Sequence, residues 1–293
     1  MLTKLKTYKF GIFSFLIVLL FMPIGHALMV LNEKLFEHYK FIGAFTIGFI
    51  GLISLIIGIT KNKNQFAATL FGLLAGVLVW TGWVEFSFVW IAEKLNVAPL
   101  MENGEIATKP EYLVMMSSLG LLLTFLVFFI LKQTNCQFFI WVQNLIGLRK
   151  YIKQEANSNK PFAILTFIET IVILWTFYIV LLLVYDNDIA GDKHPATYFV
   201  AFGSLFWSLY LTLKLIKIQK FDYAIRYAVP TVIIFWNFIE VIGRWNLLKE
   251  IWIHPFEHWL ENLIILALLI FFIGYYIAEM YMNKSKKVIK SNL

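Results

Sequence analysis

The sequence predicts an all-α integral membrane protein, a polytopic helical bundle with about eight transmembrane helices. Of the 293 residues, 60% are hydrophobic and only 15% are charged, and the mean hydropathy is +0.75. Several apolar runs reach the ~20 residues that an α-helix needs to cross a bilayer. Strands of a membrane β-barrel would alternate over roughly ten residues, and runs such as "FSFLIVLLFMPIGHALMVL" do not alternate. We therefore expect a single transmembrane domain over residues 1–293.

Eight apolar runs follow one another along the chain. The predicted spans are 10–31, 41–59, 66–92, 111–131, 161–185, 197–217, 228–248 and 263–282. The first run is too long for the apolar core of a signal peptide and has no small-residue cleavage site after it, so we interpret it as a span. The third is long enough to tilt or to protrude from the bilayer. The fourth enters as "KPEYLVMMSSLG", and the fifth and seventh carry acidic residues.

The distribution of lysine and arginine predicts the orientation of these spans. Of the 25 basic residues, 18 fall in the segments that lie inside when the N-terminus is cytoplasmic. The other seven are Lys34, Lys40, Lys94, Lys109, Lys193, Arg244 and Lys249. By the positive-inside rule, both termini are expected in the cytoplasm, with the chain in the cell inner (cytoplasmic) membrane. The net charge of +7 reflects this topology. The composition thus predicts a lipid bilayer as partner and gives no reason to expect nucleic acid.

Acidic side chains within the predicted spans are the first candidates for a functional site. A charge at membrane depth costs ~2.5–3.5 kcal/mol and usually faces a partner or a cavity. Glu85 has nothing in the third span to offset its charge, so we expect it to face the bundle interior. In the seventh span, Asn237, Glu240 and Arg244 form one polar stripe at i, i+3 and i+7. We predict catalytic roles for Glu85, Glu240 and Arg244. Alternatively, Arg244 neutralises Glu240, four residues before it, and the stripe only packs helices together.

The histidines are the second group of candidates, because all five are predicted on the extracytoplasmic side. They are His26, His38, His194, His254 and His258. In "WIHPFEHWLEN", residues 252–262, Pro255 suits the first position of a helix, with His254 as the cap and Glu257 at the third position. The motif is then either a helix cap anchored at the membrane interface or half of a metal site.

A metal site would combine these histidines with the acidic side chains of the same side. The predicted ligands are His26, His194, His254, His258, Glu85 and Glu240. Imidazole and carboxylate together suit Zn, Fe or Cu better than Mg or Ca. If the protein has a metal cofactor, we therefore expect a transition metal: Cu, Fe or Zn.

Three functions remain open from the sequence. The first is a metal-dependent, oxidoreductase-like membrane enzyme that takes a small or lipophilic substrate from the outer leaflet, with Arg244 binding an anionic group or orienting Glu240. The second is a proton- or cation-coupled transporter that uses Glu85, Glu240 and the deeper Glu169 of the fifth span. The third is a non-catalytic subunit of a membrane complex, in which the polar stripe only holds helices together.

Overall fold

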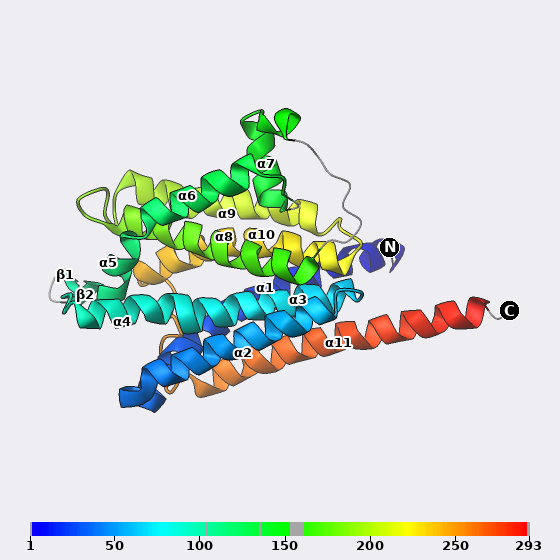
Figure 1. Cartoon of the computed structure of the whole chain (residues 1–293), viewed down its shortest axis with the longest axis horizontal. Helices are drawn as coiled ribbons and strands as arrows, with labels where there is room; N and C mark the ends of the chain where they lie inside the picture. The colour runs from blue at the N-terminus through cyan, green and yellow to red at the C-terminus, as the bar shows by residue number, and fades with distance from the viewer. Residues whose placement is uncertain (1, 103–104, 135, 153–160, 292–293) are drawn as a thin grey trace.

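The computed structural model describes residues 2–102, 105–134, 136–152 and 161–291, most of them in α-helices (Figure 1). The first part contains α1 (Leu2–Phe36), the 3₁₀-helix η1 (Glu37–Tyr39), α2 (Lys40–Thr60), α3 (Gln65–Val79), the π-helix η2 (Trp80–Glu85) and α4 (Phe86–Lys94). An antiparallel hairpin of β1 (Leu100–Glu102) and β2 (Glu105–Thr108) follows. The remaining elements are α5 (Pro110–Met116), α6 (Leu119–Leu131), α7 (Gln137–Leu145), the 3₁₀-helix η3 (Leu148–Tyr151), α8 (Phe162–Tyr185), α9 (Pro195–Leu215), α10 (Phe221–Arg244) and α11 (Trp259–Ser291).

Six helical segments among the described residues are long and apolar enough to cross a membrane. They are Tyr8–Thr60, Gln65–Lys94, Phe162–Tyr185, Pro195–Leu215, Phe221–Arg244 and Trp259–Ala278. A seventh is obtained if α5 and α6, which are bent by 50° relative to each other, form one broken span. The first segment has 53 residues and contains both α1 and α2. The helices agree with the predicted all-α membrane bundle, and the short β1–β2 hairpin is the exception.

Most helix bounds fall within a few residues of the predicted spans, but three helices reach further: α1 begins at Leu2 rather than at 10, α11 ends at Ser291 rather than at 282, and α10 begins before 228. The seventh span was expected at 228–248, whereas α10 begins seven residues earlier, at Phe221. The expectation placed Arg226 in a cytoplasmic loop, and this was wrong because Arg226 lies inside the bundle and pairs with Glu169. Helix α11 begins at Trp259, so Pro255 does not occupy its first position.

The bundle has two distinct ends (Figure 1). Helices α1, α4, α8 and α10 finish at the end where the β-hairpin lies, which we call the distal end. The two chain termini are marked at the opposite, proximal end. Helix α10 is the most buried span, since it packs against α1, α8 and α9, whereas α11 lies at the periphery against α1.

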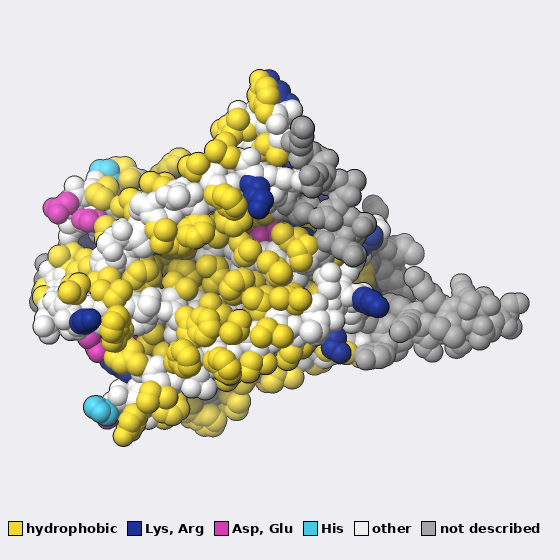
Figure 2. Space-filling model, viewed as in Figure 1, with side chains coloured by type: hydrophobic (Ala, Val, Ile, Leu, Met, Phe, Trp, Pro, Cys, Tyr) yellow, Lys and Arg dark blue, Asp and Glu magenta, His cyan; other side chains and the backbone are white. Residues whose placement is uncertain are grey.

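The surface is apolar around the middle of the bundle and polar at its ends. Figure 2 shows hydrophobic side chains over most of the visible face, Asp, Glu and His side chains at the distal end, and most of the visible Lys and Arg toward the proximal end. Helix α2 illustrates the pattern, because Phe45, Phe49 and Ile53 are exposed while Gly48 faces η2 and Gly51 faces α3. This belt is the surface that lipid chains would cover.

Close packing of α2 against the π-helix depends on glycine. A Cβ at Gly82 would come within 2.4 Å of the backbone nitrogen of Gly48, so a larger residue at position 82 would push the two helices apart. Small residues allow such close backbone approach between membrane helices. The π-helix begins beside this contact and ends at Glu85, so the packing helps to fix the position of that side chain.

Candidate functional site

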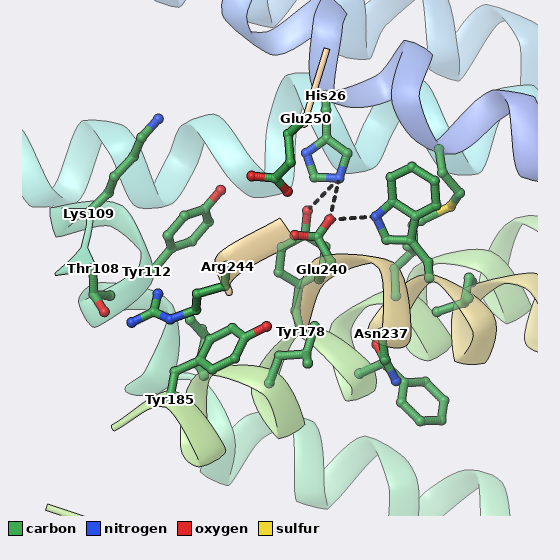
Figure 3. A pocket seen from close by; sticks show the side chains of 17 residues that line it. His26, Thr108, Lys109, Tyr112, Tyr178, Tyr185, Asn237, Glu240, Arg244 and Glu250 are labelled. Atoms are coloured by element: carbon green, nitrogen blue, oxygen red, sulfur yellow. Dashed lines mark hydrogen bonds and ion pairs between the residues drawn. The ribbon is translucent and has the colours of Figure 1, made fainter. Parts of the chain in front are cut away.

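A cavity of about 260 Å³ lies at the distal end, between α1, α5, α8 and α10. Met22, Leu174, Phe177 and Ile233 form its apolar wall. The labelled side chains in Figure 3 form its polar part and its rim: His26, Thr108, Lys109, Tyr112, Tyr178, Tyr185, Asn237, Glu240, Arg244 and Glu250. An apolar pocket with a few convergent polar groups is typical of a site for a small molecule.

Glu240, one of the predicted site residues, lies in this cavity. Its Oε1 accepts a hydrogen bond of 2.5 Å from the indole nitrogen of Trp236, one turn earlier on α10. The same oxygen lies 3.4 Å from Nε2 of His26 on α1 (Figure 3). The carboxylate is thereby held between two helices. The sequence analysis did not single out Trp236, although its (i, i+4) spacing from Glu240 is a signal that could have found it. The contact with His26 depends on how α1 packs on α10.

His26 joins Glu240 to a tyrosine that the sequence analysis did not single out. The hydroxyl of Tyr178, on α8, lies 3.4 Å from the same Nε2. The imidazole ring stacks on Trp236, with centroids 6.0 Å apart and an interplanar angle of 19°. When Nε2 carries a proton it can donate to Glu240, and when it does not it can accept from Tyr178. This geometry allows a proton to move between the imidazole and its neighbours, as in a general acid–base pair.

Arg244 faces away from Glu240. Its Nε donates to Oδ1 of Asp192 at 2.5 Å, and the guanidinium lies over the ring of Tyr185, 4.4 Å from its centroid. Figure 3 shows the guanidinium turned away from the carboxylate of Glu240. Sequence spacing favoured an intrahelical pair, but the loop between α8 and α9 supplies Asp192 instead. Arg244 thus ties this loop to α10 at the rim of the cavity.

Glu85 lies in the interior, as predicted, with only 2% of its surface exposed. It lines a smaller cavity of about 30 Å³, together with Thr81, Trp80, His26 and Tyr178. His26 and Tyr178 line the larger cavity as well, so they connect the surroundings of Glu85 with those of Glu240. Oε1 of Glu85 has no hydrogen-bond partner within the described residues. A buried, unsatisfied polar atom of this kind is costly and calls for a functional explanation. The π-helix that carries it is also a feature frequent at functional sites.

Glu250 is a pocket residue that sequence reasoning missed. It belongs to the segment between α10 and α11, and its carboxylate lies over Gly243, where an added Cβ would come within 2.6 Å of Oε1. Burial, together with the nearby charge of Glu240, raises the pKa of Glu250 from 4.5 to about 7. No local sequence pattern predicts that Glu250 lines the cavity. It does so because the segment after α10 folds back over the end of that helix.

The other predicted metal ligands lie away from this cavity. His254 and His258 lie near glutamates three residues further along, with Nδ1–Oε1 distances of 4.0 Å to Glu257 and 3.4 Å to Glu261. His194 caps α9, where its Nδ1 accepts from the backbone N–H of Ala196. Within the described parts of the chain, no group of three or more His, Cys, Asp or Glu side chains has an arrangement that could hold a metal ion.

Glu169 is engaged in a buried ion pair. Arg226 donates to it from Nε at 3.1 Å and from a terminal nitrogen at 2.5 Å, and both side chains are almost fully buried. Bidentate arginine–carboxylate pairs of this type have fixed geometry. Glu169 was predicted as part of a proton or cation path, and the structure joins it to α10 on the proximal side of the cavity.

Comparisons with protein-family models, curated proteins and solved structures found no match for this chain.

Proposed function

We propose that the chain crosses the inner membrane eight times, with the distal end extracytoplasmic and both termini cytoplasmic. The crossings would be α1, α2, α3–α4, α5–α6, α8, α9, α10 and α11, which counts Tyr8–Thr60 as two spans and the bent pair as one. A straight helix of 53 residues would measure about 80 Å at 1.5 Å per residue, far more than a ~30 Å hydrocarbon core. The excess of lysine and arginine in the proximal segments supports the orientation.

We propose further that the distal cavity binds a small amphiphilic molecule with a protonated amine. The observation that carries this proposal is the balance of charge in the cavity. Its lysine and its arginine have acidic partners outside the lining, Arg244 with Asp192 and Lys109 with Glu111. The carboxylates of Glu240 and Glu250 remain directed toward the cavity.

The rest of the lining fits the same class of ligand. The rings of Tyr112 and Tyr178 offer aromatic faces to a cation, an attraction of about 0.5–2 kcal/mol. An alkyl chain of the ligand would contact the apolar wall at Met22, Leu174 and Ile233. The pocket is therefore suited to a molecule with one cationic end and one apolar end.

Proton exchange with the bound amine is the mechanism that we propose for Glu240. An ionised Glu240 attracts the ammonium group. A proton that His26 takes up from outside and passes on through Nε2 neutralises Glu240, leaves His26 neutral again, removes that attraction and favours release. Glu85, in the adjoining small cavity, is a second proton acceptor on the same network. A carrier that exchanges protons for an organic amine would use these steps, and this is the function we favour. Because Arg226 already pairs with Glu169, we leave Glu169 out of the mechanism.

Binding is tested with three matched probes on the protein in lipid nanodiscs: hexylamine, hexanol and hexanoate. A ligand that binds the native state raises the melting temperature by mass action. We expect saturable stabilisation by hexylamine alone, and at least tenfold weaker binding in Glu240→Gln. Glu257→Gln, on an exposed side chain, is the control and should behave as the parent. Equal responses to all three probes, or an unchanged hexylamine response in Glu240→Gln, would contradict the proposal.

The metal-dependent enzyme remains a prediction from the sequence, with His254 and His258 as its decisive ligands. It is tested by measuring metal content and melting temperature of His258→Gln beside Glu257→Gln. If His258 is only an interface residue paired with Glu261, neither variant should differ from the parent in bound Zn, Fe or Cu. Loss of stoichiometric metal in His258→Gln alone would favour the enzyme over the carrier.

A further inference from the structure

A second cavity lies toward the proximal end and is lined by residues of α7, α9 and α10. Its volume is about 300 Å³, and none of its lining residues belongs to the distal cavity. Phe138 and Trp141 of α7 face Trp207 and Tyr210 of α9 across it. Aromatic side chains thus form a large part of the wall.

The aromatic side chains form one connected group. The rings of Trp141 and Trp207 have centroids 5.3 Å apart, and those of Phe138 and Trp207 are 6.2 Å apart. Trp141 and Tyr210 keep 44% and 52% of their surface exposed, so the group reaches the outside of the bundle. Tryptophan and tyrosine in such positions are typical of the headgroup level of a bilayer, where one end of the ring system is apolar and the other wet.

Among the described residues, one basic side chain lines this aromatic cavity. Lys214, in the last turn of α9, is exposed and places its Nζ 4.3 Å from the centroid of the Tyr210 ring. Asn144 of α7 also lines the cavity and can donate from its amide. An ammonium group and an amide next to an aromatic wall at headgroup level offer hydrogen-bond donors to a phosphate oxygen.

Space for an acyl chain continues along α9 beyond the cavity. Gly203 lies one turn before Trp207 on the same helix face, and a Cβ added there would meet no atom within 4 Å. Further toward the distal end on this face, Phe199 is 79% exposed. The strip from Lys214 to Phe199 therefore runs from a charged end to an apolar end along the direction of a lipid chain.

We propose that this cavity binds an anionic phospholipid of the cytoplasmic leaflet. Its phosphate would contact Lys214 and Asn144, its glycerol region the Trp141–Trp207 pair, and one acyl chain the open strip at Gly203. The cytoplasmic leaflet is where anionic lipids attract basic residues, by about 1 kcal/mol for each lysine. The assignment of the leaflet rests on the proposed orientation, but lipid binding is independent of the amine site.

The test measures quenching of tryptophan fluorescence by brominated lipids in nanodiscs of otherwise identical composition. Brominated phosphatidylglycerol should quench more than brominated phosphatidylcholine, because Trp141 and Trp207 lie in the cavity while the other tryptophans meet both lipids alike. In Lys214→Gln the preference for phosphatidylglycerol should fall about fivefold. Lys217→Gln, an exposed lysine three residues later that does not line the cavity, is the matched control and should keep the preference.

Three results would overturn the proposal. The first is equal quenching by the two lipids in the parent protein. The second is an equal loss of preference in Lys214→Gln and Lys217→Gln, which would indicate a diffuse basic surface. The third is loss of the preference when inorganic phosphate is added at constant ionic strength, which would indicate a site for free anions. None of these readouts depends on binding of an amine, so this proposal and the proposed function can fail separately.

Discussion

His26 on α1 and Glu240 on α10 face each other across 3.4 Å, although 214 positions separate them in the chain. The contact closes the polar part of the distal cavity, because Tyr178 and Trp236 approach the same two side chains from α8 and α10. Each residue was a candidate on its own, but their pairing gives the candidate site its acid–base character.

The first prediction concerns the coupling of this pair. His26→Gln removes the group that exchanges a proton with Glu240, and Glu240→Gln removes the charge that attracts an amine. We expect each single variant to weaken hexylamine binding and to flatten its pH dependence. The double variant should be no worse than Glu240→Gln alone, since residues in one network are not additive. The measurement is hexylamine affinity from melting curves over pH 5–9, and strictly additive losses would indicate that the two side chains act independently.

A second prediction concerns Glu250 and the dependence of stability on pH. The pKa of Glu250 is raised to about 7 in the folded protein, so between its ordinary value of 4.5 and about 7 the native state holds a proton that the unfolded chain has lost. Folding stability should therefore fall as pH rises through this window. Glu250→Gln removes the effect: the variant should melt at a higher temperature than the parent at pH 8.5 and at about the same temperature near pH 4.5. A difference of the same size at both pH values would show that folding does not change the pKa of Glu250.

Breaking the buried ion pair should be costly, and this is the third prediction. Glu169→Gln leaves Arg226 charged in the interior, and loss of one partner of a buried pair costs about 3–5 kcal/mol. The double variant Glu169→Gln with Arg226→Met should recover much of the loss, because it leaves no uncompensated buried charge. Unfolding in mixed micelles measures both variants. A single variant as stable as the parent would argue that the pair is solvated.

The fourth prediction concerns topology. Reporters inserted at Lys63 or fused after Leu293 should be cytoplasmic, and reporters at His38 or near Gly104 should be extracytoplasmic. His38 and Lys63 lie on either side of α2, so opposite readings at these sites would establish that α2 crosses the membrane by itself and that Tyr8–Thr60 is not a single span. Gly104 and Leu293 lie outside the described residues. Matching readings at His38 and Lys63 would reduce the number of crossings and reverse the sidedness of everything after α2.

Composition and the length of the apolar runs alone determined that this protein is a bundle of helices, six of them among the described residues long and apolar enough to cross a membrane. Long apolar runs can satisfy their backbone hydrogen bonds in lipid only as helices, so the limits of α2, α8 and α9 follow from local sequence. The interior location of Glu85 was predictable for a similar reason, since an unpaired carboxylate facing lipid is too costly.

Tertiary structure decided which polar groups meet. Sequence spacing favoured Arg244 as partner of Glu240, but the chain offers Arg244 a closer acid in Asp192 and brings His26 to Glu240. Arg226 was read as a loop charge because its partner Glu169 is 57 positions away and on another helix. Glu250 enters the cavity only because the segment after α10 folds back over Gly243. Pairing energies depend on distances between helices, and these distances are set by packing of the whole bundle rather than by any local pattern of residues.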